Sequence, residues 1–236
     1  MIAMPYSKNL TCARLRQAGF TLVEMMLAVA VAGIIAAAVY VAYLSQQRSY
    51  LAQEQVVEMQ QNLRAAMQLI TSEILKATLD PWKTAAFSVT ACQPGQFSFL
   101  WDANLDGIIG ADEQIDLGFS ASAGADSDRN GIPDAGGTAV LSLGRQINGG
   151  GGYQPVADNI QALEFNCLDL DGNATTDVNK ARIVQISILA RASRPDQKMT
   201  NTAAYSTASG ATWGPYNDNY RRRLLQTDLL IRNKGL

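Results

Sequence analysis

The sequence predicts the α+β fold class, with one long N-terminal α-helix packed on an antiparallel β-sheet. Two observations indicate the helix: no charged side chain occurs from Met25 to Leu44, and neither proline nor glycine occurs from Ser45 to Leu79. A third observation indicates the sheet, because apolar residues alternate with period two after Pro81. A helix followed only by strands favours antiparallel strands laid on one face of that helix.

The first half of the predicted helix, residues 20–44, can span a membrane. The uncharged run holds 20 residues, and at about 1.5 Å each they form about 30 Å of helix, the thickness of a bilayer's hydrocarbon core. Lys8, Arg14 and Arg16 precede the span, and the next base after it is Arg48. This distribution predicts a single pass with a cytoplasmic N-terminus.

The second half of the helix, up to residue 80, is predicted to be amphipathic. Its apolar residues recur at steps of three and four, which is the spacing of one helix face. Asp80-Pro81 is expected to end the helix, because proline restricts the residue before it. The apolar face comprises Val56, Met59, Leu63, Met67, Ile70 and Ile74, and the polar face comprises Gln53, Glu54, Glu58, Gln61, Arg64, Gln68 and Glu73.

Residues 81–236 are predicted to form one β-rich domain outside the cytoplasm. A turn is expected at Pro94-Gly95 and a hairpin turn at Asp171-Gly172-Asn173. Residues 120–137 and 193–219 are expected as loops, and 149–152 as a flexible link. The expected strands lie around 87–91, 97–101, 115–119, 140–143, 163–167, 183–188 and 224–231.

The residues before the span carry a processing motif. Gly19-Phe20-Thr21-Leu22-Val23-Glu24, followed at once by the apolar run, resembles the prepilin signal of type IV pilins and type II secretion pseudopilins. The resemblance implies that prepilin peptidase cuts between Gly19 and Phe20, removes the leader 1–19 and methylates the new N-terminus. It also implies a pilin-like fold.

Glu24 is the one acid at the start of the apolar run. A lone carboxylate in the membrane is disfavoured by several kcal/mol unless it has a partner. The resemblance implies that this partner is the freed amino group of Phe20, on the same or a neighbouring subunit, and that the pair sets the axial register during assembly. The alternative is a Glu24 in the headgroup region that pairs with nothing.

Two further segments resemble PilW-like minor pilins: Pro155 to Phe165, and Tyr220-Arg221-Arg222-Arg223 leading into the last strand. This resemblance implies a minor pilin that helps to initiate pilus assembly. Its partners would be other major and minor pilins. It would be made as an inner-membrane precursor and then enter the periplasm, the pilus and the cell surface.

Three alternatives to the minor-pilin reading stay open. The first is a minor pseudopilin of a type II secretion system, because the same leader serves both machines. The second is a membrane-anchored calcium-binding or adhesive domain that does not polymerise. The third is a receptor for DNA uptake, which would bind DNA with salt-sensitive affinity.

An acidic stretch between residues 101 and 137 predicts calcium loops. Asp102, Asn104, Asp106, Gly107 and Glu113 fit the pattern D-x-[DN]-x-[DN]-G-x5-E. Oxygen donors at alternate positions converge on one cation when the chain turns sharply at the glycine. The backbone carbonyl of Ile108 would add a donor, and Glu113 would close the shell.

A second run repeats the first half of that pattern. Its donors would be Asp126, Asp128, Asn130, the carbonyl of Ile132, and Asp134, but Gly137 stands where the closing glutamate is expected. For both runs, the alternative is an acidic, solvated hairpin whose residues only make turns. A third run around Asp169 and Asp171 has its glycine at the wrong position and is expected to be a turn.

The sequence excludes several function classes. Histidine is absent, which excludes Ser-His-Asp and Cys-His centres and histidine metal ligands. No phosphate-binding loop, dinucleotide fingerprint or G-x-S-x-G motif occurs. The sequence therefore predicts no enzyme and no small-molecule substrate. The whole chain has a net charge of −2, and without the three basic residues of the leader the mature chain is near −5. The sequence therefore also predicts no nucleic-acid partner, and Arg221–Arg223 is expected at a solvated strand edge.

The cysteines suggest an oxidising compartment. Cys12 lies in the leader, and Cys92 and Cys167 lie in strand-like segments outside the cytoplasm. Such a pair can form a disulfide. The alternative of two buried free thiols stays open, because sequence spacing does not fix the distance between Cα atoms.

Overall fold

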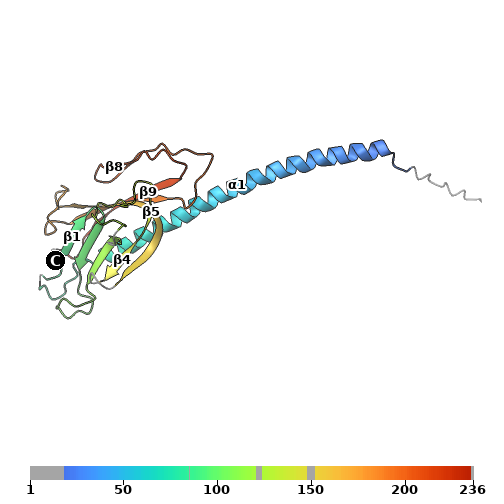
Figure 1. Cartoon of the computed structure of the whole chain (residues 1–236). Coiled ribbons are helices and arrows are strands. Elements are labelled where there is room, and N and C mark those ends of the chain that lie inside the picture. The colour runs from blue at the N-terminus through green and yellow to red at the C-terminus, as the bar shows by residue number, and fades with distance from the viewer. Residues whose placement is uncertain (1–18, 85, 121–123, 148–151, 235–236) are drawn as a thin grey trace, which may run out of the picture. The chain divides into compact units, whose positions relative to one another are not determined.

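The protein is described by a computed structural model that covers residues 19–84, 86–120, 124–147 and 152–234 (Figure 1). The leader before Gly19, with Cys12, and most of the expected link 149–152 lie outside these residues. The chain divides into two compact units, Met1–Tyr50 and Leu51–Leu236. One helix, α1, runs through Leu22–Ile74 and has residues in both units.

The part of α1 in the first unit is apolar and exposed all round. Its most apolar window has a mean hydropathy of 2.5 and none of it is buried inside the protein. Large side chains such as Leu27, Ile34 and Val41 are more than half exposed. By length and composition, this part of the helix can cross a membrane, as the sequence predicted.

The helix ends at Ile74, before the predicted end at residues 79–80. The next residues form turns, and Thr78 has a positive φ of 60°. The backbone of this segment pairs with the end of a strand: Thr78 N–H donates to the Leu100 carbonyl, and Asp102 N–H donates to the Leu79 carbonyl. Pairing with the sheet therefore stops the helix before Pro81 does.

The second unit contains a seven-stranded antiparallel sheet, which confirms the predicted fold class. Its order is β1-β2-β3-β4-β5-β6-β9, and a separate two-stranded sheet joins β7 to β8. The strands are β1 (Val89–Gln93), β2 (Gln96–Leu100), β3 (Gln114–Phe119), β4 (Leu141–Ile147), β5 (Tyr153–Leu168), β6 (Ile183–Arg191), β7 (Tyr205–Ser206), β8 (Thr212–Trp213) and β9 (Arg222–Leu230).

The expected strands are all present, but two features differ from the prediction. Strand β5 begins ten residues before Leu163, because its first half pairs with β4 and its second half with β6. Strands β7 and β8 lie inside 193–219, which was expected to be a loop. Trp213, on β8, packs against Ala162 and Leu189 on the sheet face that does not face α1.

The main core lies between α1 and the other face of the sheet. The buried helix residues include Met59, Leu63, Ala66, Ile70 and Ile74, which pack with the inward residues of the strands. The predicted apolar stripe is therefore the face that packs on the sheet. Together these side chains bury the large apolar area on which a domain of this size depends.

Glu73 was predicted on the polar face of the helix and is instead 3% exposed. Its Oε1 atom accepts from Arg145 Nη1 at 2.9 Å and from Lys76 Nζ at 3.0 Å. The carboxylate thus joins α1 to β4 by a largely buried ion pair. Sequence periodicity could not reveal this pairing, because Arg145 is 72 residues away.

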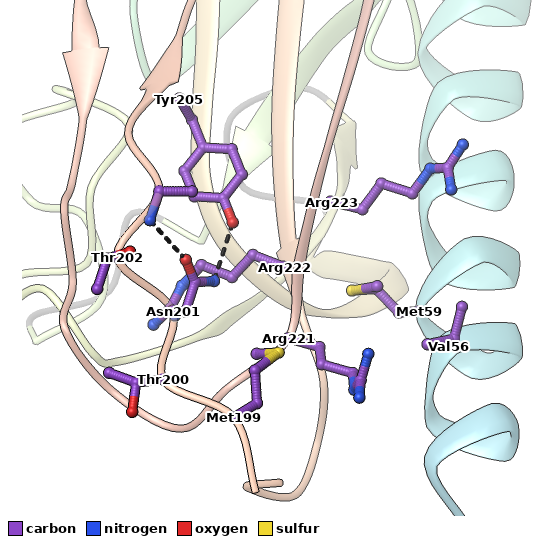
Figure 2. Close-up of a pocket in the computed structure, with 11 residues that line it drawn as sticks. Val56, Met59, Met199, Thr200, Asn201, Thr202, Tyr205, Arg221, Arg222 and Arg223 are labelled. Carbon is purple, nitrogen blue, oxygen red and sulfur yellow. Dashed lines mark hydrogen bonds between the residues drawn. The ribbon is translucent and has the colours of Figure 1, made fainter. Parts of the chain in front are cut away.

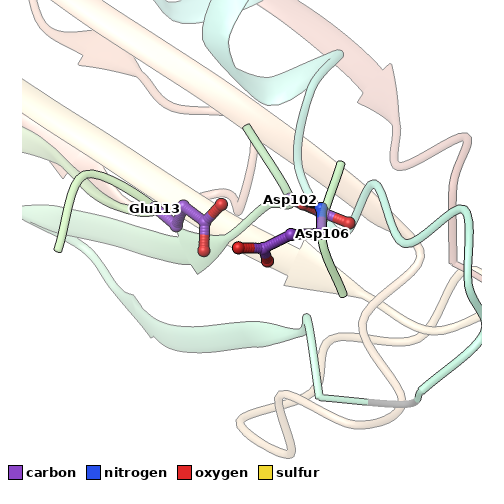
Figure 3. A group of neighbouring side chains, drawn as sticks. All are labelled: Asp102, Asp106 and Glu113. Atoms are coloured by element: carbon purple, nitrogen blue, oxygen red, sulfur yellow. Dashed lines mark hydrogen bonds between the residues drawn. The ribbon is translucent and has the colours of Figure 1, made fainter. Parts of the chain in front are cut away.

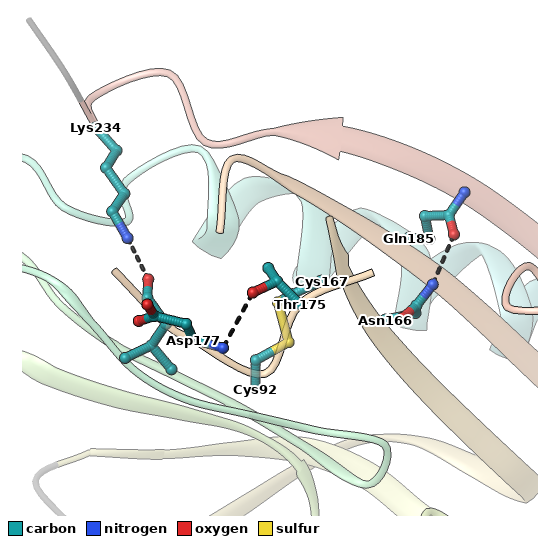
Figure 4. The surroundings of a disulfide bond; sticks show 8 residues. Cys92, Asn166, Cys167, Thr175, Asp177, Gln185 and Lys234 are labelled. Carbon is teal, nitrogen blue, oxygen red and sulfur yellow. Dashed lines mark hydrogen bonds between the residues drawn. A yellow bond between two sulfur atoms is a disulfide. The ribbon is translucent and has the colours of Figure 1, made fainter. Parts of the chain in front are cut away.

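The first five strands curl so that the edge strand β1 returns to β5. Cys92 on β1 and Cys167 on β5 are joined by a disulfide with a Cα–Cα distance of 6.4 Å (Figure 4). Phe165 N–H also donates to the carbonyl of Pro94, in the turn that joins β1 to β2. The edge strand at this end of the sheet is therefore fastened to its centre.

Candidate functional site

The N-terminal motif forms a capped helix start. Thr21 stands just before α1, and its backbone N–H and hydroxyl donate to Oε2 of Glu24 at 2.9 and 3.0 Å, while Glu24 N–H donates to the Thr21 hydroxyl. This reciprocal arrangement is a capping box, which satisfies free N–H groups at the helix start. Phe20 is 84% exposed. Helix capping is thus a local role that Glu24 has besides any role between subunits.

The first acidic loop, residues 102–113, brings three carboxylates together. Oxygen atoms of Asp102, Asp106 and Glu113 all lie within 4.8 Å of one another (Figure 3). Asp102 is 0% exposed and Glu113 is 2% exposed, while Asp106 is open to solvent. Buried carboxylates this close repel each other unless a cation or hydrogen bonds compensate.

The backbone of the first loop is folded around those carboxylates. Asp102 accepts hydrogen bonds from the N–H groups of Asp106 and Gly107 at 3.1 Å. Glu113, which immediately precedes β3, accepts from the N–H groups of Ala103 and Gly110. Each carboxylate oxygen has two lone-pair sites, so these bonds leave capacity for a cation.

The second loop, residues 126–137, repeats this turn bond for bond. Asp126 accepts from the N–H groups of Asn130 and Gly131 at 3.1 Å, four and five residues further on, as Asp102 does. Arg129 and Gly131 have φ values of 58° and 79°, and the matching residues Leu105 and Gly107 have 64° and 75°. The same residue pattern therefore produces the same left-handed backbone positions at both sites.

The second loop differs in how its acids are placed. Oxygen atoms of Asp126, Asp128 and Asp134 lie within 4.8 Å of one another. Asp126 is 0% exposed, and its burial raises the pKa of this carboxyl. Asp134 instead accepts from the Ser127 hydroxyl and N–H, and these bonds lower its pKa. The position of the missing glutamate is occupied by Gly137.

The run around Asp169 forms a turn, as the sequence predicted. Gly172 N–H donates to the Asp169 carbonyl, and Asn173 N–H donates to the Asp169 carboxylate at 2.8 Å. Among the described residues, the groups of acids close enough to hold a metal ion are those of the first and second loops. The third run is therefore a turn and not part of such a group.

The arginine run was expected at a solvated edge, but two of its members form ion pairs. The side chain of Arg222 is 0% exposed, pairs with Asp218 and stacks on Tyr216 at 4.1 Å. Arg221 pairs with Asp196 at 2.6 Å. Arg223 alone is exposed. The prediction of a fully solvated edge is thus wrong for Arg222, whose acidic partner lies in the segment expected to be a loop.

A groove of about 430 Å³ lies beside these arginines (Figure 2). Val56 and Met59 of α1 form one wall, and the segment Met199–Ala203 forms the other. Asn201 holds that segment in place, because its side-chain amide donates to the Tyr205 hydroxyl and the Tyr220 carbonyl. Arg221 and Arg222 therefore fasten the 193–219 segment to β9 through Asp196 and Asp218.

The N-terminal motif and the fold each have a counterpart among known proteins. Residues 14–40 match the family model described as the prokaryotic N-terminal methylation motif. No curated protein matches the chain. Among solved structures, the fold is similar to that of the type IV-like pilin TTHA1219 from Thermus thermophilus, with a TM-score of 0.43 and 14% identity over 75% of this chain and 98% of that one.

The matched residues contain Gly19, Phe20 and Glu24, and they end inside the apolar part of α1. The chain therefore carries an N-terminal methylation motif that continues into this helix. Its motif and its exposed apolar helix fit a membrane-anchored precursor.

Proposed function

We propose that the protein is a minor pilin of a type IV pilus that contributes to the initiation of pilus assembly. The observation that carries this proposal is the methylation motif, which ends in an exposed apolar helix of membrane-spanning length. Prepilin peptidase would cut between Gly19 and Phe20 and methylate Phe20. The segments at 155–165 and 220–223 favour a PilW-like minor pilin. The protein would act as a structural component without catalytic turnover.

Assembly requires a signal that aligns one apolar helix with the next. Moving such a helix from lipid into a bundle of helices replaces one apolar environment by another, so specificity must come from packing and polar contacts. Glu24 lies four residues after the cleavage position, and its capping bonds both use Oε2. We propose that this carboxylate pairs with the amino group of Phe20 on a neighbouring subunit.

Intact mass spectrometry of the membrane-extracted protein tests the processing step. We expect loss of residues 1–19 and the added mass of one methyl group. Glu24→Ala should be processed normally but should enter filaments poorly. Glu24→Gln keeps a side-chain oxygen for the helix cap but removes the negative charge, so it shows whether the charge or the cap is required. A protein that retains its leader in a host with active prepilin peptidase would overturn the proposal.

The rival function is a minor pseudopilin of a type II secretion system. Both machines use this leader, so the discriminating measurement is partner identity. Co-purification from host membranes should recover pilins of the type IV pilus. Recovery of secretion-system pseudopilins in their place would establish the rival.

We also propose that the first and second loops bind calcium. The fit rests on the clustered carboxylates and on the burial of Asp102, Glu113 and Asp126. The first loop would hold the ion with Asp102, Asn104, Asp106, the Ile108 carbonyl and Glu113. The second would use Asp126, Asp128, Asn130, the Ile132 carbonyl and Asp134. The ion would neutralise buried negative charge, and a thermal melt with and without chelator tests the proposal.

A further inference from the structure

We propose that the open edge of β9, together with the apolar groove between β9 and α1, binds an extended segment of a neighbouring pilin-like subunit as an added β-strand. The inference rests on the proposed function, because the partner is a subunit of the same filament. It adds a second contact, in the β domain, to the contacts of the apolar helices.

Strand β9 is the free edge of the seven-stranded sheet. In the sheet order it neighbours β6 alone, whereas the opposite edge strand, β1, is tied to β5 by the Cys92–Cys167 disulfide. Nine residues of β9 extend along this edge. An edge strand of this length presents a row of backbone donors and acceptors that another strand can pair with.

Two hydrogen bonds show which backbone groups of β9 point outward. At one end the carbonyl of Arg221 accepts from Ala192 N–H, and at the other Ile231 N–H donates to Arg182, so odd-numbered residues face β6. Successive residues of a strand point their backbone groups to opposite sides. The N–H and C=O groups of Leu224, Gln226 and Asp228 therefore point outward, and no backbone hydrogen bond within the described residues uses them.

An apolar groove of about 400 Å³ runs beside this edge. Met67, Thr71 and Leu75 of α1 line one side of it, and Leu225 of β9 lines the other. A strand added to β9 would place every second side chain in this groove, under the helix. The incoming segment must therefore carry apolar side chains at alternate positions.

Charge at the groove's rim adds a further requirement. Arg64 borders the groove, is exposed, and forms no ion pair within the described part of the chain. An acidic residue at the corresponding end of the incoming segment would complement it. A helix could also fill the groove, but it would leave the outward backbone groups of β9 unpaired, so a strand is the occupant that satisfies both features.

Photo-crosslinking in host membranes distinguishes a strand from a helix. A benzophenone amino acid is placed at Arg223 or at Thr227, which share the groove side of β9 with Leu225. The two positions are about 13 Å apart along a strand. For a strand partner, the crosslinked residue on the neighbouring pilin should shift by about four positions between the two probes. For a helix partner the shift would be about nine positions.

Proline at an outward position tests the added backbone bonds. Asp228→Pro removes an N–H that points away from β6, whereas Asp228→Ala keeps it. We expect Asp228→Pro to reduce the crosslink yield about five-fold or more, the factor for one lost backbone hydrogen bond. Asp228→Ala should crosslink as the parent does, and both variants should melt at similar temperatures.

A second pair of variants tests the groove if Asp228→Pro fails to fold. Thr71→Arg puts a charged side chain into the groove, and Gln61→Arg puts the same side chain at an exposed position of α1 outside the groove. Thr71→Arg alone should reduce crosslinking. The inference would be overturned if the crosslinked residue on the partner shifts by about nine positions. It would also be overturned by crosslinks to lipid or to a second copy of this chain only, or by equal crosslink yields in Thr71→Arg and Gln61→Arg. A precursor that is not processed would instead overturn the proposed function.

Discussion

The first and second acidic loops have the same turn but different supports. In the first loop, the turn is closed by Glu113, which belongs to the loop itself. In the second loop, residues from outside the loop hold the turn. Gly95 N–H donates to the Arg129 carbonyl, and Leu163 N–H donates to the Gly131 carbonyl. Local sequence thus sets the turn in both loops, and tertiary contacts support it in the second loop.

The second loop lies between the β1–β2 turn and β5, close to the disulfide. It pairs with β5 at Leu163, beyond Ile160, where the pairing of β5 with β4 ends. The first loop instead exposes its apolar side chains, with Leu105 at 54% and Ile108 at 69%. The tip of the first loop contacts Trp82, whose indole N–H donates to the Leu105 carbonyl at 2.7 Å. The second loop is therefore packed into the domain by backbone hydrogen bonds, whereas the tip of the first loop extends into solvent.

The largest expected effect comes from adding a methyl group at the equivalent glycines. A Cβ atom at Gly131 would lie 1.9 Å from the Leu163 carbonyl oxygen, whereas one at Gly107 would lie 3.1 Å from the Trp82 side chain. Gly131→Ala should lower the free energy of unfolding by about 3 kcal/mol or more. Gly107→Ala should cost about 1 kcal/mol, mainly for its positive φ. Denaturant unfolding of the detergent-solubilised protein measures both, and equal costs would contradict the difference in support.

Calcium should produce the second largest effect, and mainly through the first loop. At a calcium concentration of about 100 times Kd, binding to the native state adds about 2.7 kcal/mol, or about 5 to 10 °C in Tm for a domain of this size. Glu113→Gln should remove most of the shift, because it weakens the donor that closes the loop. Asp128→Asn, in the second loop, should leave most of it.

Thermal melts in calcium and in chelator, read for the parent and both variants, check this prediction. A parent midpoint that does not respond to calcium would rule out the metal at both loops. A shift that survives Glu113→Gln but is lost in Asp128→Asn would reverse the assignment of the ion to the first loop.

The sequence predicted the turns because their signals are local. Asp, Asn and Gly at fixed offsets set the backbone of both loops, and Pro94-Gly95 set the first hairpin. The amphipathic stripe of α1 likewise predicted its buried face. The N-terminal motif could be recognised because its residues are consecutive in the sequence. Each of these features depends on residues only a few positions apart.

The features that the sequence did not predict depend on distant residues. Arg222 is buried where its Nε donates to the side chain of Gln161 on β5, which is 61 positions away. Glu73 is buried because Arg145 reaches it from β4. The early end of α1 at Ile74 follows from pairing between Thr78 and Leu100. No periodicity reports such contacts, because they exist only after the sheet has formed.

A pH titration supplies a reference away from both loops. Hydrogen bonds from Arg222 lower the pKa of Asp218. A carboxylate whose pKa is lower in the folded state than in the unfolded state stabilises the fold. This stabilisation is fully present above the unfolded-state pKa of about 3.9, and it is lost as the pH falls through the folded-state pKa. Asp218→Asn should therefore cost about 1 to 3 kcal/mol at pH 7, and this cost should shrink below about pH 4. Unfolding in chelator at both pH values measures it, and a cost that grows in acid would contradict the sign.

The smallest effect is expected at the third acidic turn. Asp171 is exposed. In the first and second loops, Gly107 and Gly131 supply a second residue with positive φ, but Ala174 stands at the matching position of this run. Asp171→Asn should change the free energy of unfolding by less than about 0.5 kcal/mol and should leave the calcium-induced shift in Tm unchanged. A reduced shift would mean that alternating acids alone suffice to hold the ion. The glycine and the closing carboxylate would then no longer explain why the first loop differs from a simple turn.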